Sequence, residues 1–220
     1  MAQLIAVSEF LFSTVLLETE EGKVATGLIV QHEDRVLLIT AAHAMPDTAE
    51  ARLRIGSSQN LGRTDLILAR VDDRDLAAED DVAIFQLPNL SWRLDSSRIS
   101  DEGLYHSMDV LMVGYPGGQN FLLQLPGGPQ VFPMVKKGII AAATSDPSRL
   151  YLDIIANPGF SGSPLLMALP SAPEAMIAGM VIQTAVVSDD RSELSLNAAG
   201  VSVAVPSALV RKHIANTRRA

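Results

Sequence analysis

The 220-residue chain contains no cysteine. Disulfides, thiolate metal sites and a cysteine nucleophile are therefore excluded. A chain without disulfides suits a reducing compartment. The stretch from Met1 to Leu17 is largely apolar, but Glu9 interrupts it and no Lys or Arg precedes Lys23. Because a signal peptide begins with a positively charged region, none is expected here, and we expect a cytoplasmic protein.

Positive charge is also scarce. The chain has 17 Lys and Arg against 25 Asp and Glu, a formal net charge of -8 and a pI near 4.9. Nucleic-acid-binding proteins usually carry a basic stripe, so we expect no nucleic-acid partner. No apolar run reaches the roughly 18 residues of a membrane span, so no membrane partner is expected either. No group of His, Asp and Glu has metal-ligand spacing, and we expect no metal and no other cofactor.

The chain does have many short hydrophobic runs. Hydrophobic residues make up 48% of the chain and charged residues 19%, which is enough to form a substantial core. Turn residues separate the runs, a pattern typical of antiparallel strands. Only residues 207–216 look like a helix. The expected strands cover residues 10–17, 24–31, 35–40, 51–55, 64–71, 82–87, 109–115, 121–125, 131–144, 151–155, 176–187 and 200–205.

A polar, irregular stretch between Pro88 and Gly103 divides these strands into two halves. Many short strands, almost no helix and a connection in mid-chain are typical of two packed β-barrels. The predicted fold class is all-β, with two packed antiparallel β-barrels and a short C-terminal helix. Within one domain of residues 1–220, we place the N-terminal barrel at about 8–88, the linker at about 89–106 and the C-terminal barrel with its helix at about 107–217.

The stretch NPGFSGSP at residues 157–164 follows an expected strand. It places Ser161 two residues after one glycine and directly before another. Small neighbours let a substrate carbonyl reach a serine hydroxyl, and glycine permits the tight turn that aims backbone N–H groups at a developing oxyanion. Taken alone, the cluster fits an ordinary surface turn equally well.

Two upstream residues change this balance. His43 ends the sequence TAAH just past the third expected strand, where it can project into a cleft. Asp81 opens the apolar run VAIF, and a carboxylate at the buried start of a strand is costly unless it has a hydrogen-bonded partner. Either residue alone would more often have only a structural role. Together with Ser161 they supply a nucleophile, its general base and the carboxylate that orients the base.

The three motifs together resemble those of trypsin/chymotrypsin-like serine peptidases, and the chain is closest in style to bacterial Deg/HtrA-type domains. TAAH at 40–43 matches the histidine motif and DVAI at 81–84 the aspartate motif. GFSGSP at 159–164 matches the serine motif, with Ser163 where many members carry glycine. The resemblance covers nearly the whole chain. Weaker matches are ATG at 25–27, VGYP at 113–116 and VAVPS at 203–207.

The resemblance implies a serine endopeptidase that hydrolyses protein or peptide substrates through an acyl-enzyme. Ser161 would attack the peptide carbonyl, His43 would act as general base and then general acid, and Asp81 would orient His43. The backbone N–H groups of Gly159 and Ser161 would form the oxyanion hole. Phe160 stands where activated digestive proteases carry an aspartate that pairs with a freed N-terminus. We therefore expect no activation by N-terminal cleavage.

The resemblance also indicates a substrate-binding pocket for the side chain that precedes the scissile bond. Ile155 and Ala156, before the serine motif, would border it, together with Gln183 and Thr184 in a later strand. Ile155 and Ala156 offer no charge, so we expect a preference for small or medium-sized apolar side chains.

Two other functions stay open on the sequence alone. An α/β-hydrolase would combine Ser161 with His213 and with Asp189 or Asp190. However, Ser163 stands where its nucleophile elbow needs a second glycine, and alternating strands and helices are absent upstream.

The second alternative is a catalytically silent protease fold that binds peptides or acts as a scaffold. A distorted oxyanion loop would silence the site without changing any triad residue. No PDZ-like domain is expected after the closing strand, and the sequence leaves open a regulatory partner.

Overall fold

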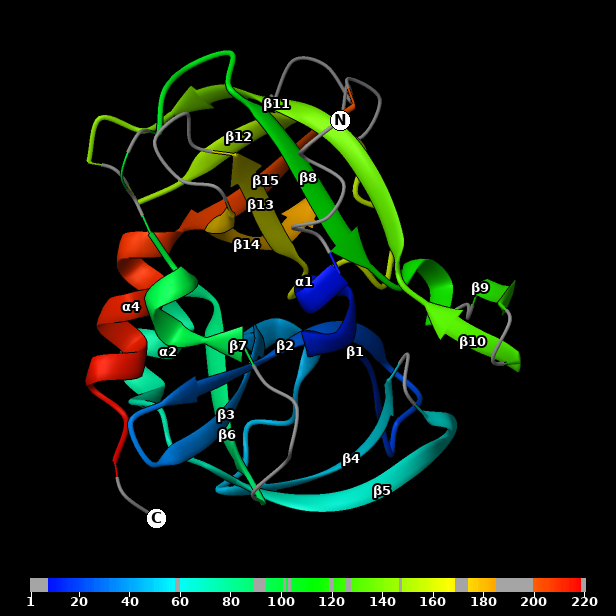
Figure 1. The fold of residues 1–220 in the computed structure, drawn as a ribbon. Helices are drawn as coiled ribbons and strands as arrows, with labels where there is room; N and C mark the ends of the chain where they lie inside the picture. The colour runs from blue at the N-terminus through cyan, green and yellow to red at the C-terminus, as the bar shows by residue number, and fades with distance from the viewer. Residues whose placement is uncertain are drawn as a thin grey trace, which may run out of the picture.

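The computed structural model describes residues 8–57, 60–88, 94–100, 102, 104–118, 121–125, 128–146, 148–168, 174–184 and 200–218. Over these residues the chain forms two closed barrels of six antiparallel strands and a short helix, α4 (Ser207–Ala215), after the last strand. Figure 1 shows the C-terminal barrel above the N-terminal barrel, with α4 running along one side of both. The predicted fold class is confirmed.

The N-terminal barrel closes in the order β1-β4-β5-β6-β3-β2, with β2 pairing back onto β1. A short strand, β7 (Leu94–Asp95), adds to β2 in parallel. In β4 the side chains of Leu53 and Ile55 are buried while Arg52 and Arg54 are exposed, as expected for a strand with one face toward the core. The strands are β1 (Thr14–Thr19), β2 (Val24–His32), β3 (Arg35–Ala41), β4 (Glu50–Ser57), β5 (Asn60–Arg70) and β6 (Val82–Leu87).

The C-terminal barrel closes in the order β11-β12-β15-β14-β13-β8, with β8 pairing onto β11. A separate hairpin of β9 (Phe121–Leu125) and β10 (Gly128–Phe132) projects away from it, at the right of Figure 1. The barrel strands are β8 (Asp109–Gly114), β11 (Met134–Ala143), β12 (Leu150–Asp153), β13 (Pro164–Ala168), β14 (Ala175–Thr184) and β15 (Val201–Pro206).

One apolar cluster joins the two barrels. It includes Leu37 of β3 from the first barrel, Val113 and Ile177 from the second, and Val210 of α4. Helix α4 packs against strands of both barrels. Because burial of this shared core holds the barrels together, side chains at the ends of their strands meet at the junction between them.

The N-terminal strand starts later than the sequence predicts. Residues 8–13 form a short helix, α1 (Ser8–Ser13), and only Thr14 begins β1. Phe10 is fully buried, so the hydrophobic signal there comes from packing and not from strand pairing. The hydroxyl of Thr14 donates to the carbonyl oxygen of Phe10 at 2.7 Å, a helical i to i−4 contact that ends the helix.

Three further elements differ from the sequence-based expectation. Helix α2 (Arg74–Asp80) forms between two expected strands, where no helix was expected, since seven residues give too little periodicity to detect. The run expected over 131–144 is two strands, β10 and β11, separated at Pro133, which has no N–H to donate. Strand β13 was not expected. Residues 89–93 of the linker, residues 185–187, and Asp189 and Asp190 lie outside the described residues.

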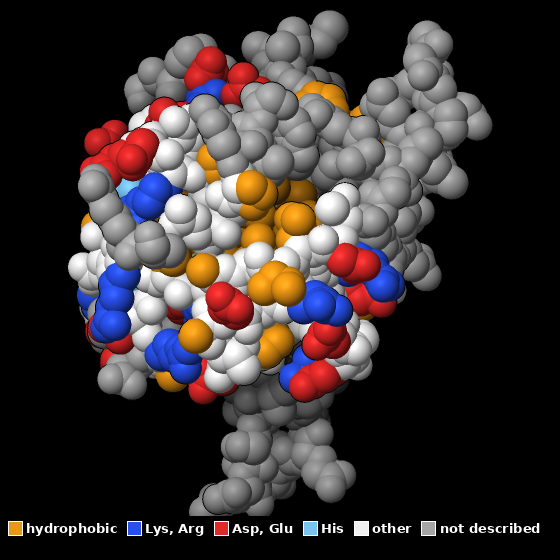
Figure 2. All heavy atoms as spheres, turned by 90° about the horizontal axis from the view of Figure 1, so that it is seen from below, with side chains coloured by type: hydrophobic (Ala, Val, Ile, Leu, Met, Phe, Trp, Pro, Cys, Tyr) orange, Lys and Arg blue, Asp and Glu red, His pale blue; other side chains and the backbone are white. Residues whose placement is uncertain are grey.

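Charges of both signs are interspersed on the surface of the N-terminal barrel. Figure 2 shows Lys and Arg side chains among Asp and Glu, around hydrophobic side chains near the middle of this face. Ion pairs there include Arg52 with Glu20 and Arg54 with Asp65. Among the described helices, none is both long and apolar enough to cross a membrane.

Candidate active site

The loop that carries Ser161 runs from β12 to β13 and depends on two glycines with positive φ. Gly159 has φ +98° and Gly162 has φ +87°, a region that disfavours other residues. Each glycine also lies against backbone of another segment. A Cβ on Gly159 would overlap the carbonyl oxygen of Tyr115, and one on Gly162 would overlap that of Thr26. The turn that presents Ser161 therefore requires glycine at positions 159 and 162.

His43 and Asp81 approach Ser161 from the N-terminal barrel. His43 lies in a 3₁₀ turn, η2 (Ala42–Ala44), directly after β3, and its side chain is 47% exposed. Asp81 lies between α2 and β6, with its side chain largely buried and its φ at +62°. The predicted position of His43 just past a buried strand is thus the observed one.

The three side chains form a continuous chain of contacts. Nδ1 of His43 lies 2.8 Å from Oδ2 of Asp81, and Nε2 of His43 lies 3.1 Å from Oγ of Ser161. A carboxylate only accepts hydrogen bonds, so Nδ1 is the donor, which leaves Nε2 as the acceptor for the serine proton in neutral His43. The second carboxylate oxygen of Asp81 accepts the backbone N–H of His43 at 2.8 Å. Asp81 therefore fixes both the ring and the backbone of His43.

Two peptide groups in the serine loop have fixed orientations. The carbonyl oxygen of Pro158 accepts the N–H of Gly117 at 2.6 Å, and that of Phe160 accepts the N–H of Ser163 at 2.9 Å. Both peptides are trans, so the N–H that follows each carbonyl points the opposite way. These are the N–H groups of Gly159 and Ser161, and within the described chain no acceptor is bonded to either. Both donors of the serine loop therefore have no acceptor within the described residues.

Thr26 of β2 ties this loop to the N-terminal barrel. Its backbone N–H donates to the carbonyl oxygen of Ser161 at 2.8 Å, and its hydroxyl donates to that of Gly159 at 2.7 Å. The same hydroxyl accepts the N–H of Tyr115 at 3.0 Å. Thr26 is fully buried, so these contacts are shielded from water and connect both barrels to the loop.

A cation supports the other side of the loop. The ammonium of Lys136, in β11, donates to the carbonyl oxygen of Ile155 at 2.9 Å and to Oδ1 of Asn157 at 2.6 Å. It also lies 5.0 Å from the centre of the Phe160 ring, a cation–π distance. Partial desolvation lowers the pKa of Lys136. Nothing in the local sequence around Lys136 indicates these contacts.

The predicted substrate-binding residues fall on two segments that both contact β15. Ile155 is 54% exposed and faces Gly200, whereas Ala156 is buried and its N–H donates to Oγ of Ser202 at 2.9 Å. The backbones of Gln183 and Thr184 lie in β14, where they pair with Val203 and Ser202 of β15.

A cleft of about 440 Å³ opens beside His43 and Asp81. Its lining comes from both barrels, including Ile182 of β14 and Arg149 of the β11–β12 turn. No local motif around Arg149 indicates this position. Within the described part of the chain, no group of three or more His, Cys, Asp or Glu residues could hold a metal ion.

The family described as the trypsin-like peptidase domain matches residues 25–168. This span is more than half of the chain and contains His43, Asp81 and Ser161. The chain therefore belongs to the trypsin-like peptidase family, whose substrates are proteins or peptides. A search of curated protein sequences gave no match.

Several solved structures share this fold. The inactive form of a serine-to-alanine mutant of Rv3671c from M. tuberculosis H37Rv has a TM-score of 0.65 at 17% identity, over 96% of this chain and 88% of that chain. The serine endoprotease from Yersinia pestis has a TM-score of 0.61 at 19% identity, over 96% and 64% of the two chains. The HtrA-type protease AlgW with tripeptide has a TM-score of 0.62 at 20% identity, over 96% and 61%. The chain thus spans less than two thirds of the last two proteins, and at such identities the likeness establishes the fold.

Proposed function

We propose that the protein is a serine endopeptidase that hydrolyses peptide bonds through an acyl-enzyme. In this mechanism Ser161 is the nucleophile. His43 takes its proton through Nε2 and later delivers that proton to the leaving amine. Asp81 holds the Nδ1–H of His43 and stabilises the imidazolium that forms. The observation that carries the proposal is the unbroken series of contacts from Asp81 through His43 to Ser161, at 2.8 and 3.1 Å.

The N–H groups of Gly159 and Ser161 serve as the oxyanion hole in this proposal. Donors that are already oriented stabilise the developing negative charge without reorganisation during the reaction. Here the carbonyl of each peptide is bonded on the opposite side, by Gly117 and Ser163. This arrangement favours a competent resting site over the catalytically silent scaffold that the sequence left open, because a distorted oxyanion loop would turn at least one of these carbonyls toward the hole.

The pocket for the side chain before the scissile bond is proposed to lie between Ile155 with Ala156 on one side and Gln183 with Thr184 on the other. The exposed side chain of Ile155 offers an apolar surface there. We therefore expect cleavage after small or medium-sized apolar residues. A peptide library with one varied position tests this, and a preference for charged residues would contradict it.

The test of the proposed function is labelling by a fluorophosphonate probe, which reacts only with an activated serine. We expect wild type to be labelled and to hydrolyse an unfolded protein substrate. Ser161→Ala should keep its melting temperature, lose labelling and lose turnover by a factor on the order of a million. A folded wild type that neither reacts nor cleaves, or a Ser161→Ala variant that cleaves like wild type, would refute the assignment.

A further inference from the structure

A second aspartate, Asp80, lies directly before Asp81, and the proposed mechanism does not use it. Its side chain is only 10% exposed. One carboxylate oxygen accepts a hydrogen bond from Nε2 of His213 at 2.9 Å, and His213 itself is 1% exposed. His213 lies in α4, so this buried contact joins the C-terminal helix to the residue before Asp81.

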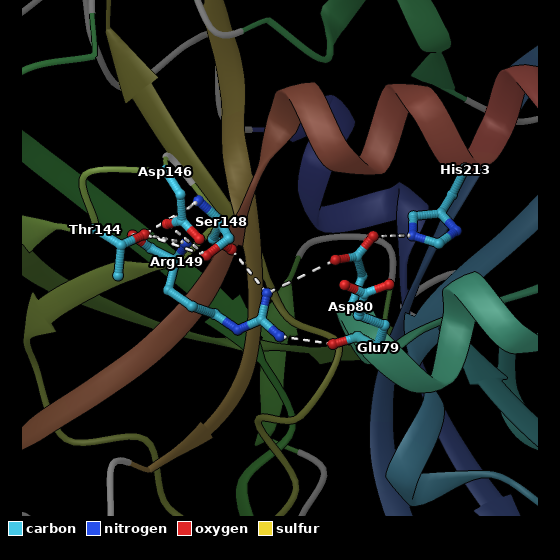
Figure 3. A network of polar contacts seen from close by, with 7 residues as sticks. All are labelled: Glu79, Asp80, Thr144, Asp146, Ser148, Arg149 and His213. Carbon is cyan, nitrogen blue, oxygen red and sulfur yellow. Dashed lines mark hydrogen bonds and ion pairs between the residues drawn. The ribbon is translucent and has the colours of Figure 1, made fainter.

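Arg149 reaches the same point from the C-terminal barrel, as Figure 3 shows. One nitrogen of its guanidinium donates to the carbonyl oxygen of Glu79 at 2.9 Å. The other lies 4.0 Å from Oδ1 of Asp80, the carboxylate oxygen that His213 does not contact. Glu79 and Asp80 are the last two residues of α2. The end of α2 is therefore held by an imidazole from α4 and by a guanidinium from the turn between β11 and β12.

The turn that presents Arg149 is internally bonded. The hydroxyl of Thr144 accepts the backbone N–H groups of Ser148 and Arg149, at 3.1 and 3.0 Å. The carboxylate of Asp146 accepts the hydroxyl of Ser148 at 2.8 Å. Hydrogen bonds from Thr144 and Ser148 lower the pKa of Asp146 to about 2, so the turn keeps its anionic acceptor at neutral pH. Arg149 thus extends from a fixed turn.

Asp81 needs such support because its backbone is strained. A φ of +62° places it in the left-handed region, which a residue with a side chain adopts only where its neighbours fix it. Both carboxylate oxygens of Asp81 are bonded to His43. The following strand holds its C-terminal side, where its carbonyl oxygen accepts the N–H of Ala42 at 3.1 Å. Its N-terminal side depends on Asp80.

We propose that His213 and Arg149 are positioning residues that hold the left-handed backbone of Asp81 through Asp80 and Glu79. If the end of α2 were released, Asp81 would relax toward an ordinary φ. Its carboxylate would then move out of hydrogen-bond reach of Nδ1 of His43. This inference rests on the proposed function for its effect on turnover, but the geometry of Asp81 and His43 tests it independently.

The main test removes the buried pair without leaving an unpaired polar group, in the double variant Asp80→Ala/His213→Leu. We expect kcat for peptide hydrolysis to fall about tenfold to a hundredfold, the size of effect that a small misplacement produces, with KM unchanged. Asp80→Asn keeps a carbonyl oxygen that accepts from His213 and should retain most of the turnover. Arg149→Ala should lower kcat in the same direction, and Arg149→Lys should restore part of it.

The second readout is the low-field proton resonance of the His43 Nδ1–H, measured by NMR. It reports the hydrogen bond to Asp81 whether or not the protein cleaves the peptide used. We expect the resonance in wild type and a shifted or lost resonance in the double variant and in Arg149→Ala. If wild type shows the resonance but no turnover, the proposed function fails while the positioning role is still tested.

The matched control is Arg54→Ala. Arg54 pairs with Asp65 at 2.9 Å on exposed strands of the N-terminal barrel, and its loss should leave kcat, KM and the resonance unchanged. Wild-type kcat and an unshifted resonance in the folded double variant would overturn the role of His213. The same result in Arg149→Ala would overturn that of Arg149. If the double variant does not fold, Asp80→Asn and Arg149→Ala test the proposal instead. A wild-type kcat and resonance in Arg149→Ala, together with a lowered kcat in Asp80→Asn, would contradict the positioning role.

Discussion

Phe160 stands directly before Ser161 and is fully buried in the core of the C-terminal barrel. A carboxylate at this position would need a cationic partner inside that core. The ring needs none, and its face instead receives the ammonium of Lys136. The Lys136 ammonium, from β11, also donates to the Ile155 carbonyl oxygen and to Oδ1 of Asn157. It therefore supports the serine loop.

Lys136→Met tests this support. The variant keeps the length of the side chain but loses two hydrogen bonds and the cation–π contact. We expect kcat/KM to fall about five- to tenfold, the equivalent of about one net hydrogen bond. Lys137→Met is the matched control, because Lys137 pairs only with the exposed Asp109, and it should behave as wild type.

The same residue predicts an alkaline limit to the activity of wild type. Desolvation lowers the pKa of Lys136 below the ordinary 10.5 of lysine. The ammonium is present below that pKa and is lost as the pH rises through it. The pH profile of kcat/KM should therefore decline at a pH below 10.5 in wild type, and this decline should be absent from Lys136→Met. Identical alkaline limbs in the two proteins would show that Lys136 does not support the loop.

Gly159→Ala probes the proposed oxyanion donor directly. Alanine would combine an unfavourable φ of +98° with an overlap against the Tyr115 carbonyl, so the peptide must turn and its N–H must move. We expect a loss of about a hundredfold or more in kcat/KM. Gly22→Ala is the control, because φ there is +77° but the space around a Cβ is open. Both variants should lose about 1 kcal/mol or more of unfolding free energy from left-handed strain, and only Gly159→Ala should lose activity.

At the scale of elements, we predict that the turn around Asp146 has an acid-dependent stability. Hydrogen bonds from Thr144 and Ser148 lower the pKa of Asp146 from 3.8 to about 2. A carboxyl with a depressed pKa in the folded state contributes stability above its unfolded pKa and loses it as the pH falls to the folded value. Wild type should therefore lose more melting temperature than Asp146→Asn between pH 4 and pH 2, in the window set by these two values. Parallel curves of melting temperature against pH for the two proteins would contradict a stabilising role of ionised Asp146 in the turn.

The elements that the sequence predicts are those with a local signal. Alternation reveals β4, and frequent turns delimit most of the other strands. Helices α1 and α2 have six and seven residues, too few for a 3.6-residue period to separate them from strand or loop. Strand β13 directly follows the serine loop and has four consecutive buried residues, from Pro164 to Met167, in place of alternation. These elements form because tertiary packing overrides local preference.

At the scale of the whole molecule, local sequence signals predict one part of the candidate site and miss the other. The residues His43, Asp81 and Ser161 could be found from the sequence because each lies in a short motif with its own backbone requirement. The contacts that support them could not. Lys136 is 24 residues away from Phe160 along the chain, and Thr26 is 133 residues away from Gly159. The Lys136 contact depends on how the C-terminal barrel closes, and the Thr26 contact depends on how the two barrels dock. Docking follows from a shared core that no single motif encodes.

Thr26→Val tests this docking. Valine matches the shape of threonine but leaves the N–H of Tyr115 and the carbonyl oxygen of Gly159 without their partner. Leaving buried polar groups unpaired costs about 1–3 kcal/mol each, which the loop can avoid only by moving. Thr14→Val is the control, since Thr14 is equally buried and its hydroxyl donates to the carbonyl oxygen of Phe10 in α1. We expect both variants to lose unfolding free energy in urea denaturation and only Thr26→Val to lose kcat, by about tenfold or more, in proportion to the cost per group. Equal kcat values in the two variants would mean that the serine loop keeps its geometry without the Thr26 hydroxyl.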